Sequence, residues 1–262
     1  MTALLPESAV AVDRASAVHA HALSLHGHRG VVYGPVDLEV DAGELAVVHG
    51  PQGGGRSSLL LTVAGRMQPD RGSELTVLGE PLPRRRRAVQ RRAAIAGFAG
   101  IDDLDESVAV RVLVRERLAW LTPWYRRVPR VTQARFERLA RPVYGDRPVP
   151  RVESVVWDLD EVDVMLLRLT LAMLQCPELL VVDDVDQVHD SARRQLVWSR
   201  LEAIAASGTT VVASVASLDE VARFTWQRAP RQVFLATGPH ATQDLPTEAP
   251  EPSSAHAGDR AL

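Results

Sequence analysis

The glycine-rich segment "HGPQGGGRSS", residues 49–58, has the residue types and spacing of a loop that binds phosphate. Successive backbone N–H groups in such a loop point inward as a nest for an anion, and the positive end of a following helix adds to the attraction. A glycine-rich turn that binds nothing is the alternative. The predicted phosphate-binding residues are Gly50, Pro51, Gln52, Gly53, Gly54, Gly55, Arg56, Ser57 and Ser58.

A second candidate lies far downstream, where the apolar run "PELLVVDD" ends in Asp183 and Asp184. A continuous apolar run is typical of a parallel strand that is buried on both faces. The Ser57 hydroxyl and the Asp183 carboxylate are oxygen ligands of the kind that Mg²⁺ prefers, so we predict that they hold this metal. A buried strand capped by acids would give the same run, but the loop and the strand together favour a nucleotide site.

The flanking segments predict an alternating α/β domain over residues 19–237. Short apolar segments read as strands up to residue 48, and "SSLLLTVAGRM" after the loop has helical spacing, which is the context that a phosphate loop requires. Further strands are predicted in "GSELTVLGE" and "AAIAGF", and a mostly helical lobe at about 102–176. Residues 1–18 are expected to be flexible, and residues 238–262, rich in proline, alanine and acids, to be disordered.

Composition limits the class of protein. Of 262 residues, 46% are apolar, and the net charge of −3 gives no reason to expect nucleic acid as a partner. The single cysteine, Cys176, fits a reducing cytoplasm. The first residues do not read as a signal peptide, and no run of about 18 apolar residues predicts a membrane span.

Residues 20–236 resemble the ATP-binding subunits of ABC transporters. The likeness lies in residues 32–82, which include the glycine loop, in "LAMLQCPELLVVDDVDQVHD" and in "GTTVVASVASLDEVARF". The resemblance implies an α/β P-loop NTPase fold of the ABC-ATPase type, with an antiparallel β subdomain and a helical lobe. It also implies ATP and Mg²⁺ as cofactors, a homo- or heterodimer of ATP-binding subunits and a separate transmembrane permease subunit. The location it implies is cytoplasmic, peripheral at the inner face of the plasma membrane.

The family's signature motif, "LSGGQ", closes over the γ-phosphate held by a partner subunit, and here it falls on "LDEVD", residues 159–163. Three of these positions are acids. A carboxylate about 4 Å from a phosphate charge costs about 4 kcal/mol at an effective dielectric near 20. The lost serine hydrogen bond would add about 1.5–3 kcal/mol. We therefore expect that this segment does not grip a partner's ATP.

Other departures point the same way. The resemblance places the catalytic glutamate of the family at Asp184, which is one methylene shorter, and the switch histidine at Ala216, which has no hydrogen-bonding group. Arg56 stands where the family has lysine, and its planar fork is a different phosphate ligand from a compact ammonium. All 30 basic residues are arginine, so Arg56 also fits drift in a chain without lysine.

Several family positions are less well defined. The glutamine that senses Mg²⁺ would fall near Gly100. The aromatic that stacks on adenine would be His26, with Tyr33 as the poorer candidate, but a loop histidine without that role fits His26 better. Asp190 stands at the family's D-loop aspartate, and an N-cap for the helix from Ser191 explains it as well.

Two further features of the sequence each allow two interpretations. The run "RRRRAVQRR" at 84–92 reads as a solvated helix face, with contact to anionic lipid as the alternative. Trp120, Trp124 and Tyr125 lie in the predicted helical lobe, where the family docks its membrane subunit, but core packing is expected for at least one of them.

The sequence thus predicts an ATP-binding transporter subunit whose hydrolysis is weak or depends on a partner ATPase. The alternative is a catalytically inactive regulatory or scaffold protein of the same fold. A P-loop kinase or GTPase is poorly supported, because the guanine-reading "NKxD" element needs asparagine and lysine, and the chain has neither.

Overall fold

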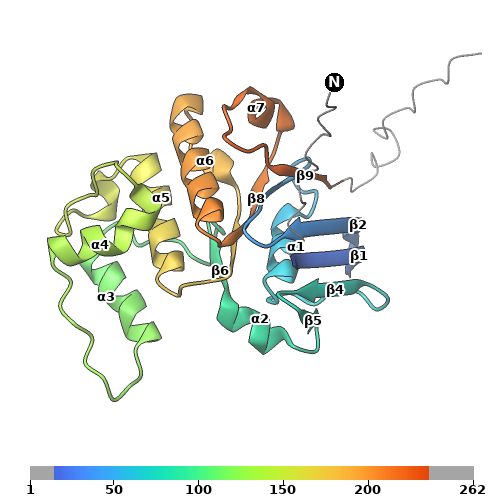
Figure 1. Ribbon diagram of the computed structural model, residues 1–262, viewed down its shortest axis with the longest axis horizontal. Coiled ribbons are helices and arrows are strands. Elements are labelled where there is room, and N and C mark those ends of the chain that lie inside the picture. The colour runs from blue at the N-terminus through green and yellow to red at the C-terminus, as the bar shows by residue number, and fades with distance from the viewer. Residues whose placement is uncertain (1–14, 236–262) are drawn as a thin grey trace, which may run out of the picture.

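The computed structural model describes residues 15–235, which form two sheets and a helical lobe (Figure 1). The first sheet is antiparallel, with strand order β2-β1-β4-β5. Its strands are β1 (Ser16–Gly27), β2 (Gly30–Asp41), β4 (Glu74–Val77) and β5 (Glu80–Leu82). The strand predicted in "GSELTVLGE" is confirmed as β4, but it ends at Val77. The chain then turns at Leu78 and Gly79, both at positive φ, and β5 pairs with β4.

The second sheet is parallel throughout, with strand order β6-β7-β8-β3-β9. Its strands are β6 (Ala93–Ala96), β7 (Leu179–Val182), β8 (Thr210–Val215), β3 (Leu45–His49) and β9 (Arg231–Phe234). Every residue of β7 and β8 is buried, as the continuous apolar runs predict for parallel strands covered on both faces.

Two hydrophobic cores lie on the opposite faces of this sheet. Along β7, Leu180 and Val182 pack into the core under the helical lobe, while Leu179 and Val181 pack into the core shared with the antiparallel sheet. The period of two along the strand sends alternate side chains to the two cores. The parallel sheet is therefore fixed from both sides, and so is the edge at which its strands end.

The helices follow the predicted order. The main ones are α1 (Arg56–Val63), α2 (Arg86–Arg92), α3 (Val110–Leu121), α4 (Gln133–Tyr144), α5 (Glu161–Met173), α6 (Ser191–Ala206) and α7 (Leu218–Arg223). Two short 3₁₀ helices are η1 (Val156–Asp158) and η2 (Val185–Gln187). Helices α3, α4 and α5 form a lobe beside the parallel sheet, within the predicted range 102–176 (Figure 1).

The ends of the domain differ slightly from the prediction. Strand β1 begins at Ser16, so residues 16–18 are part of the sheet and not of a flexible N-terminus. Residues 1–14 and the predicted tail 238–262 lie outside the described residues. Within residues 15–235, no helix is long and apolar enough to cross a membrane.

Candidate nucleotide-binding site

The glycine loop joins the carboxyl end of β3 to the start of α1, as the sequence predicts. Gly55 is the N-cap residue of α1 and has left-handed backbone angles, with φ 82°. No side chain caps this helix, so its first N–H groups keep their capacity for a ligand. A helix that starts in this way at the end of a parallel strand is suited to bind an anion.

Close packing explains two of the glycines. A Cβ on Gly55 would collide with the carbonyl oxygen of Val32 in β2, and one on Gly50 would lie 2.7 Å from the carbonyl oxygen of Leu235. Gly53 also has a positive φ, of 77°, but a Cβ there would meet nothing within 4 Å. The loop is thus held between β2 and the end of β9, while its tip at Gly53 remains open.

Arg56 is half-buried at the first position of α1, and its Nη1 is buried without a hydrogen-bond partner among the described residues. A buried guanidinium nitrogen without an acceptor is costly, and an anionic oxygen would relieve that cost. Together with the uncapped helix, this orphaned donor fits the phosphates of a nucleotide.

Asp183 follows β7 and is held by Ser214 of β8. The Ser214 hydroxyl donates to Oδ1 of Asp183 over 2.6 Å and accepts from the Asp184 backbone N–H over 2.9 Å. Ser214 is fully buried and Asp183 is 6% exposed, so the carboxylate has a fixed orientation. The sequence analysis missed Ser214, although pairing β8 in register with β7 would have placed it beside Asp183.

The donor set also fits Mg²⁺ shared with a nucleotide. In the described part of the chain, no group of three or more His, Cys, Asp or Glu side chains could hold a metal ion by itself. Mg²⁺ often binds one or two protein oxygens together with substrate phosphates and water. Ser57, exposed in the first turn of α1, and Asp183 are the residues that would hold it.

Asp184 has a costly environment. It caps η2 in a left-handed conformation, with φ 48°. Burial raises the pKa of its carboxyl, the charges of Asp186 and Asp183 raise that pKa further, and Arg56 and Arg194 oppose them. A carboxylate with a raised pKa suits a proton acceptor, but it disfavours the folded state once it is ionised.

We therefore expect Asp184→Asn to increase the free energy of unfolding at neutral pH. The raised pKa means that the folded protein binds more protons than the unfolded one above the ordinary value of 3.8, so stability falls as pH rises through this window. Urea unfolding from pH 3 to 8 tests this. The gain should disappear toward pH 3, and Asp146→Asn, at an exposed carboxylate, should show none. Destabilisation at pH 7 would contradict the assignment.

The altered signature segment forms the start of α5. Asp160 is the N-cap residue, and its Oδ1 accepts from the Asp163 N–H over 2.7 Å. Arg147 donates to both carboxylates, to Asp160 over 2.9 Å and to Asp163 over 2.8 Å. Glu161 accepts from the His189 N–H over 3.0 Å and contacts its ring.

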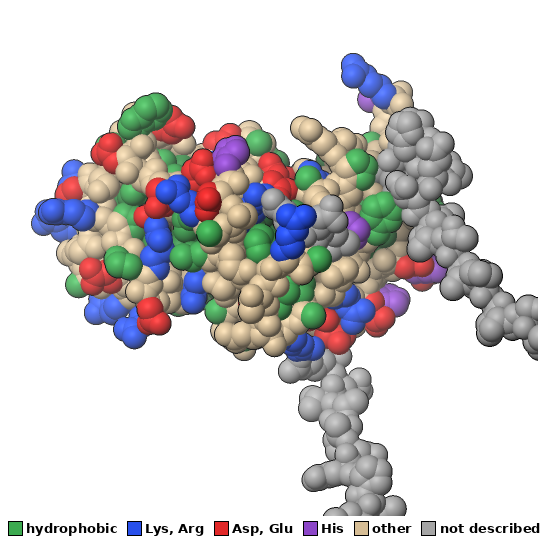
Figure 2. Space-filling model, turned by 90° about the horizontal axis from the view of Figure 1, so that it is seen from above, with side chains coloured by type: hydrophobic (Ala, Val, Ile, Leu, Met, Phe, Trp, Pro, Cys, Tyr) green, Lys and Arg blue, Asp and Glu red, His purple; other side chains and the backbone are tan. Residues whose placement is uncertain are grey.

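These acids therefore have structural partners, and their charges are partly neutralised within the chain. The face seen from above carries acidic, basic and histidine side chains close together near its middle (Figure 2). The repulsion expected from bare acids is reduced. However, the segment still lacks the hydroxyl and the glycines that the family uses, and the Asp160 side chain is occupied as a helix cap.

Ala216, at the switch position of the family, is hydrogen-bonded through its backbone to the ion pair of Asp186 and Arg194. The Ala216 backbone N–H donates to Oδ2 of Asp186 over 2.6 Å, and Oδ1 of the same carboxylate accepts from Arg194 over 2.8 Å. Asp190 accepts from the Arg193 N–H over 2.8 Å as the N-cap of α6, so the capping interpretation is confirmed.

The predicted adenine-stacking and Mg²⁺-sensing positions differ in their surroundings. Tyr33 is fully buried and donates to Thr62 of α1, so it cannot stack on a base. His26 stays exposed, with Nδ1 2.6 Å from Asp70. The Gly100 backbone N–H donates to Asp103 in a turn. The sequence analysis did not consider Gln187 of η2, whose side-chain amide donates to the Gly97 carbonyl over 2.7 Å.

The expectation of core packing for one of three lobe aromatics was wrong. Trp120, Trp124 and Tyr125 are 79%, 95% and 68% exposed. Trp120 lies at the end of α3, and the other two follow it in the connection to α4. Their rings therefore lie at the surface of the helical lobe.

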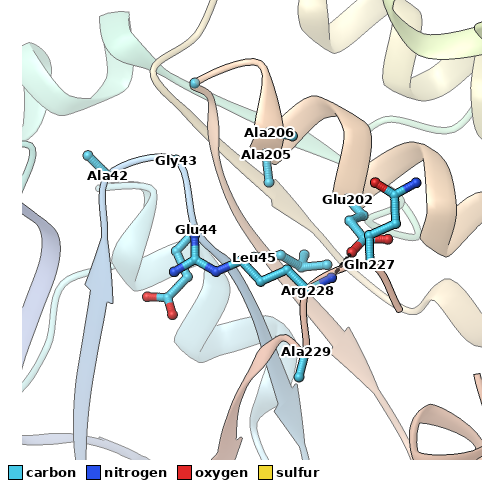
Figure 3. A pocket seen from close by; sticks show the side chains of 11 residues that line it. Ala42, Gly43, Glu44, Leu45, Glu202, Ala205, Ala206, Gln227, Arg228 and Ala229 are labelled. Carbon is cyan, nitrogen blue, oxygen red and sulfur yellow. Dashed lines mark hydrogen bonds between the residues drawn. The ribbon is translucent and has the colours of Figure 1, made fainter. Parts of the chain in front are cut away.

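A separate cavity of about 470 Å³ lies at the opposite, amino end of the parallel sheet, where β3 and β8 begin (Figure 3). Polar side chains around it include Glu44, Glu202 and Arg228. Glu44 is paired with Arg231 over 3.1 Å, and Glu202 accepts from the Arg228 backbone N–H. Parallel α/β sheets bind ligands at the carboxyl ends of their strands, which favours the glycine loop over this cavity.

Comparison with known proteins supports a nucleotide site at the glycine loop. No family model matches the chain. It is 31% identical over 201 residues to a Nod factor export ATP-binding protein I from Bradyrhizobium diazoefficiens, covering 74% of this chain and 60% of that protein. The Mesorhizobium japonicum protein of the same name is 29% identical over 223 residues, covering 84% and 60%. The chain thus spans about three fifths of the length of these relatives.

Solved structures match the fold. That of cbiO1 from Clostridium perfringens, part of an ABC transporter complex, has a TM-score of 0.63 and 14% identity, covering 79% of this chain and 80% of that one. An ATP-binding subunit of an ABC transporter has a TM-score of 0.59 and 20% identity, covering 83% and 85%. With the glycine loop at the carboxyl end of β3 and Asp183 at the carboxyl end of β7 in the same parallel sheet, the chain belongs to the ABC ATP-binding cassettes.

Proposed function

We propose that this cassette is the ATP-binding subunit of an ABC transporter. It binds ATP–Mg²⁺ through the loop Gly50–Ser58 and Asp183, and bound ATP supplies the phosphoanhydride bond whose cleavage drives transport. The observation that carries the proposal is the buried, unpaired Nη1 of Arg56 at the uncapped start of α1. The relatives are named as ATP-binding proteins for export, which supports the same assignment.

Each residue of the site has a separate role in this proposal. The N–H groups at the start of α1 bind phosphate oxygens, and the Arg56 fork neutralises their charge. Ser57 and Asp183 hold the metal, while Ser214 keeps the Asp183 carboxylate oriented. Asp184 is the candidate base for the attacking water, with a reach one methylene shorter than that of glutamate.

A groove between the parallel sheet and the helical lobe suits a membrane subunit. It encloses about 360 Å³, and Arg117, Arg168 and Glu116 lie among its charged residues. Its apolar lining comes from Ile95, Ile101, Leu104, Leu113, Trp120 and Leu171. We propose that a helix of a separate permease subunit docks here and holds the cassette at the inner face of the plasma membrane.

The departures at the catalytic positions lead us to propose weak hydrolysis by the chain alone. The phosphate loop retains most of the residues of the family motif. At the signature position, however, Asp160 caps α5 and accepts a hydrogen bond from Arg147. A second cassette with an intact signature motif would supply the missing contacts to ATP held in this loop. A heterodimer therefore fits the chain better than a homodimer.

Titration of the purified protein with ATP, with and without Mg²⁺, tests the central proposal. We expect Mg²⁺-dependent binding with Kd at or below about 1 mM, which corresponds to about −4 kcal/mol. Asp183→Asn should weaken binding at least tenfold in Mg²⁺ and little in its absence, whereas Asp146→Asn should behave as wild type. Absence of binding at millimolar nucleotide would refute the proposal.

The alternative is a regulatory or scaffold protein of this fold that does not turn over ATP. The signature segment favours this alternative, because its Asp160 caps α5 and pairs with Arg147, contacts that stabilise the fold and do not bind nucleotide. ATP turnover by wild type and by Arg56→Lys, alone and with the candidate membrane partner, separates the two. Multiple turnover with the partner supports the transporter subunit. Binding without turnover in every combination supports the scaffold.

A further inference from the structure

The connection between α3 and α4 presents aromatic and basic side chains to solvent together. We define the aromatic loop as residues 123–130, "PWYRRVPR". Trp124 is 95% exposed and Tyr125 is 68% exposed, with their rings in edge contact at a centroid distance of 5.9 Å. A turn in which the Arg126 N–H donates to the Pro123 carbonyl over 2.8 Å holds them at the tip.

The charged side chains of the aromatic loop are all of one sign. The loop contains three arginines and no acid, and Arg126, Arg127 and Arg130 are exposed. Residues 84–92, which include α2, add the exposed arginines Arg84, Arg86, Arg87 and Arg91, while Arg85 and Arg92 are paired with Glu80 and Glu178. The aromatic loop and α2 both lie along the lower edge of the molecule (Figure 1). In a chain whose net charge is −3, this edge is therefore locally basic.

We infer that this edge contacts an anionic lipid bilayer directly, with Trp124 and Tyr125 inserted at the level of the headgroups. Tryptophan and tyrosine favour that depth because their rings are apolar while their N–H and O–H groups stay hydrated. Arginines attract anionic headgroups and can donate two parallel hydrogen bonds to lipid phosphate. The aromatic loop thus combines both elements of a membrane-surface contact.

The shape of the loop favours a bilayer over a protein groove as the occupant. Trp120 lines the groove assigned above to the permease, whereas neither Trp124 nor Tyr125 does. Both rings project from a turn, and projecting rings enter a bilayer without a preformed complementary cavity. The inference does not require nucleotide, so it can fail while the proposed function holds, and the reverse is also true.

Vesicle flotation of the full chain without nucleotide tests the inference. We expect binding to phosphatidylcholine vesicles that contain phosphatidylglycerol, little binding to phosphatidylcholine alone, and loss of binding as salt rises. The double change Trp124→Ser, Tyr125→Ser should weaken partitioning about tenfold, because it removes both apolar rings from the lipid interface. Arg126→Ser and Arg127→Ser should each weaken it about fivefold, which corresponds to about 1 kcal/mol per basic residue.

Matched controls lie elsewhere on the surface. Trp157, 74% exposed in η1, and Arg138, exposed in α4, should tolerate serine without a change in partitioning. Trp124→Phe should keep most of the binding but lose the quenching of tryptophan emission by brominated lipid, whereas Trp157→Phe should retain it. Equal binding by all variants, or binding that appears only with the permease present, would overturn the inference.

Discussion

Replacing Gly55 by alanine should lower the free energy of unfolding by about 2–5 kcal/mol and abolish measurable ATP binding. The left-handed backbone at φ 82° costs a residue with a Cβ about 1–2 kcal/mol. The added Cβ would also collide with the Val32 carbonyl oxygen, and overpacking of this kind costs about 1–3 kcal/mol. Denaturant unfolding and ATP titration of the same preparation measure the two effects.

Gly53→Ala is the matched control for this prediction. Its φ of 77° imposes similar backbone strain, but its Cβ would meet nothing within 4 Å. We therefore expect a loss of only about 1–2 kcal/mol, from the backbone strain alone. Equal losses in the two variants would show that the contact between the loop and β2 does not constrain Gly55.

The phosphate loop and the parallel strands could be predicted because their signals are local. Gly55 and Arg56 stand directly between a buried strand and a helical pattern, and "ELLVV" is too short and too apolar for a half-exposed element. The same apolar run placed Asp183 at the end of its strand, and the structure brings that carboxylate to the carboxyl edge of the same sheet as the loop.

The contacts that adjust the site could not be predicted in this way, because they join residues far apart in the sequence. Ser214 reaches Asp183 only through the register of β8 with β7, and Arg147 reaches Asp160 only through the packing of the helical lobe. The sequence analysis counted the signature acids as bare charges for the same reason. A single sequence shows which residues are charged but not which of them are paired.

Removing the Arg194 guanidinium should have the second large effect. Arg194 is 7% exposed in α6, donates to Asp186 over 2.8 Å and to the His189 carbonyl over 3.1 Å. Breaking a buried ion pair by deleting one partner costs about 3–5 kcal/mol, because the other charge loses its compensation. We therefore expect Arg194→Ala to lose this amount in denaturant unfolding.

The neighbouring Arg193 provides the control, because it lies on the same helix but its side chain is exposed. Arg193→Ala should change stability by no more than about 0.5 kcal/mol, as is usual for surface positions. Arg194→Lys should fall between the two, since lysine keeps the charge but cannot donate in the same planar fork to Asp186 and His189. Because Asp186 also accepts from the Ala216 N–H at the end of β8, Arg194→Ala should weaken ATP binding as well. Unchanged stability with lost binding would instead mean that Arg194 acts directly on the nucleotide.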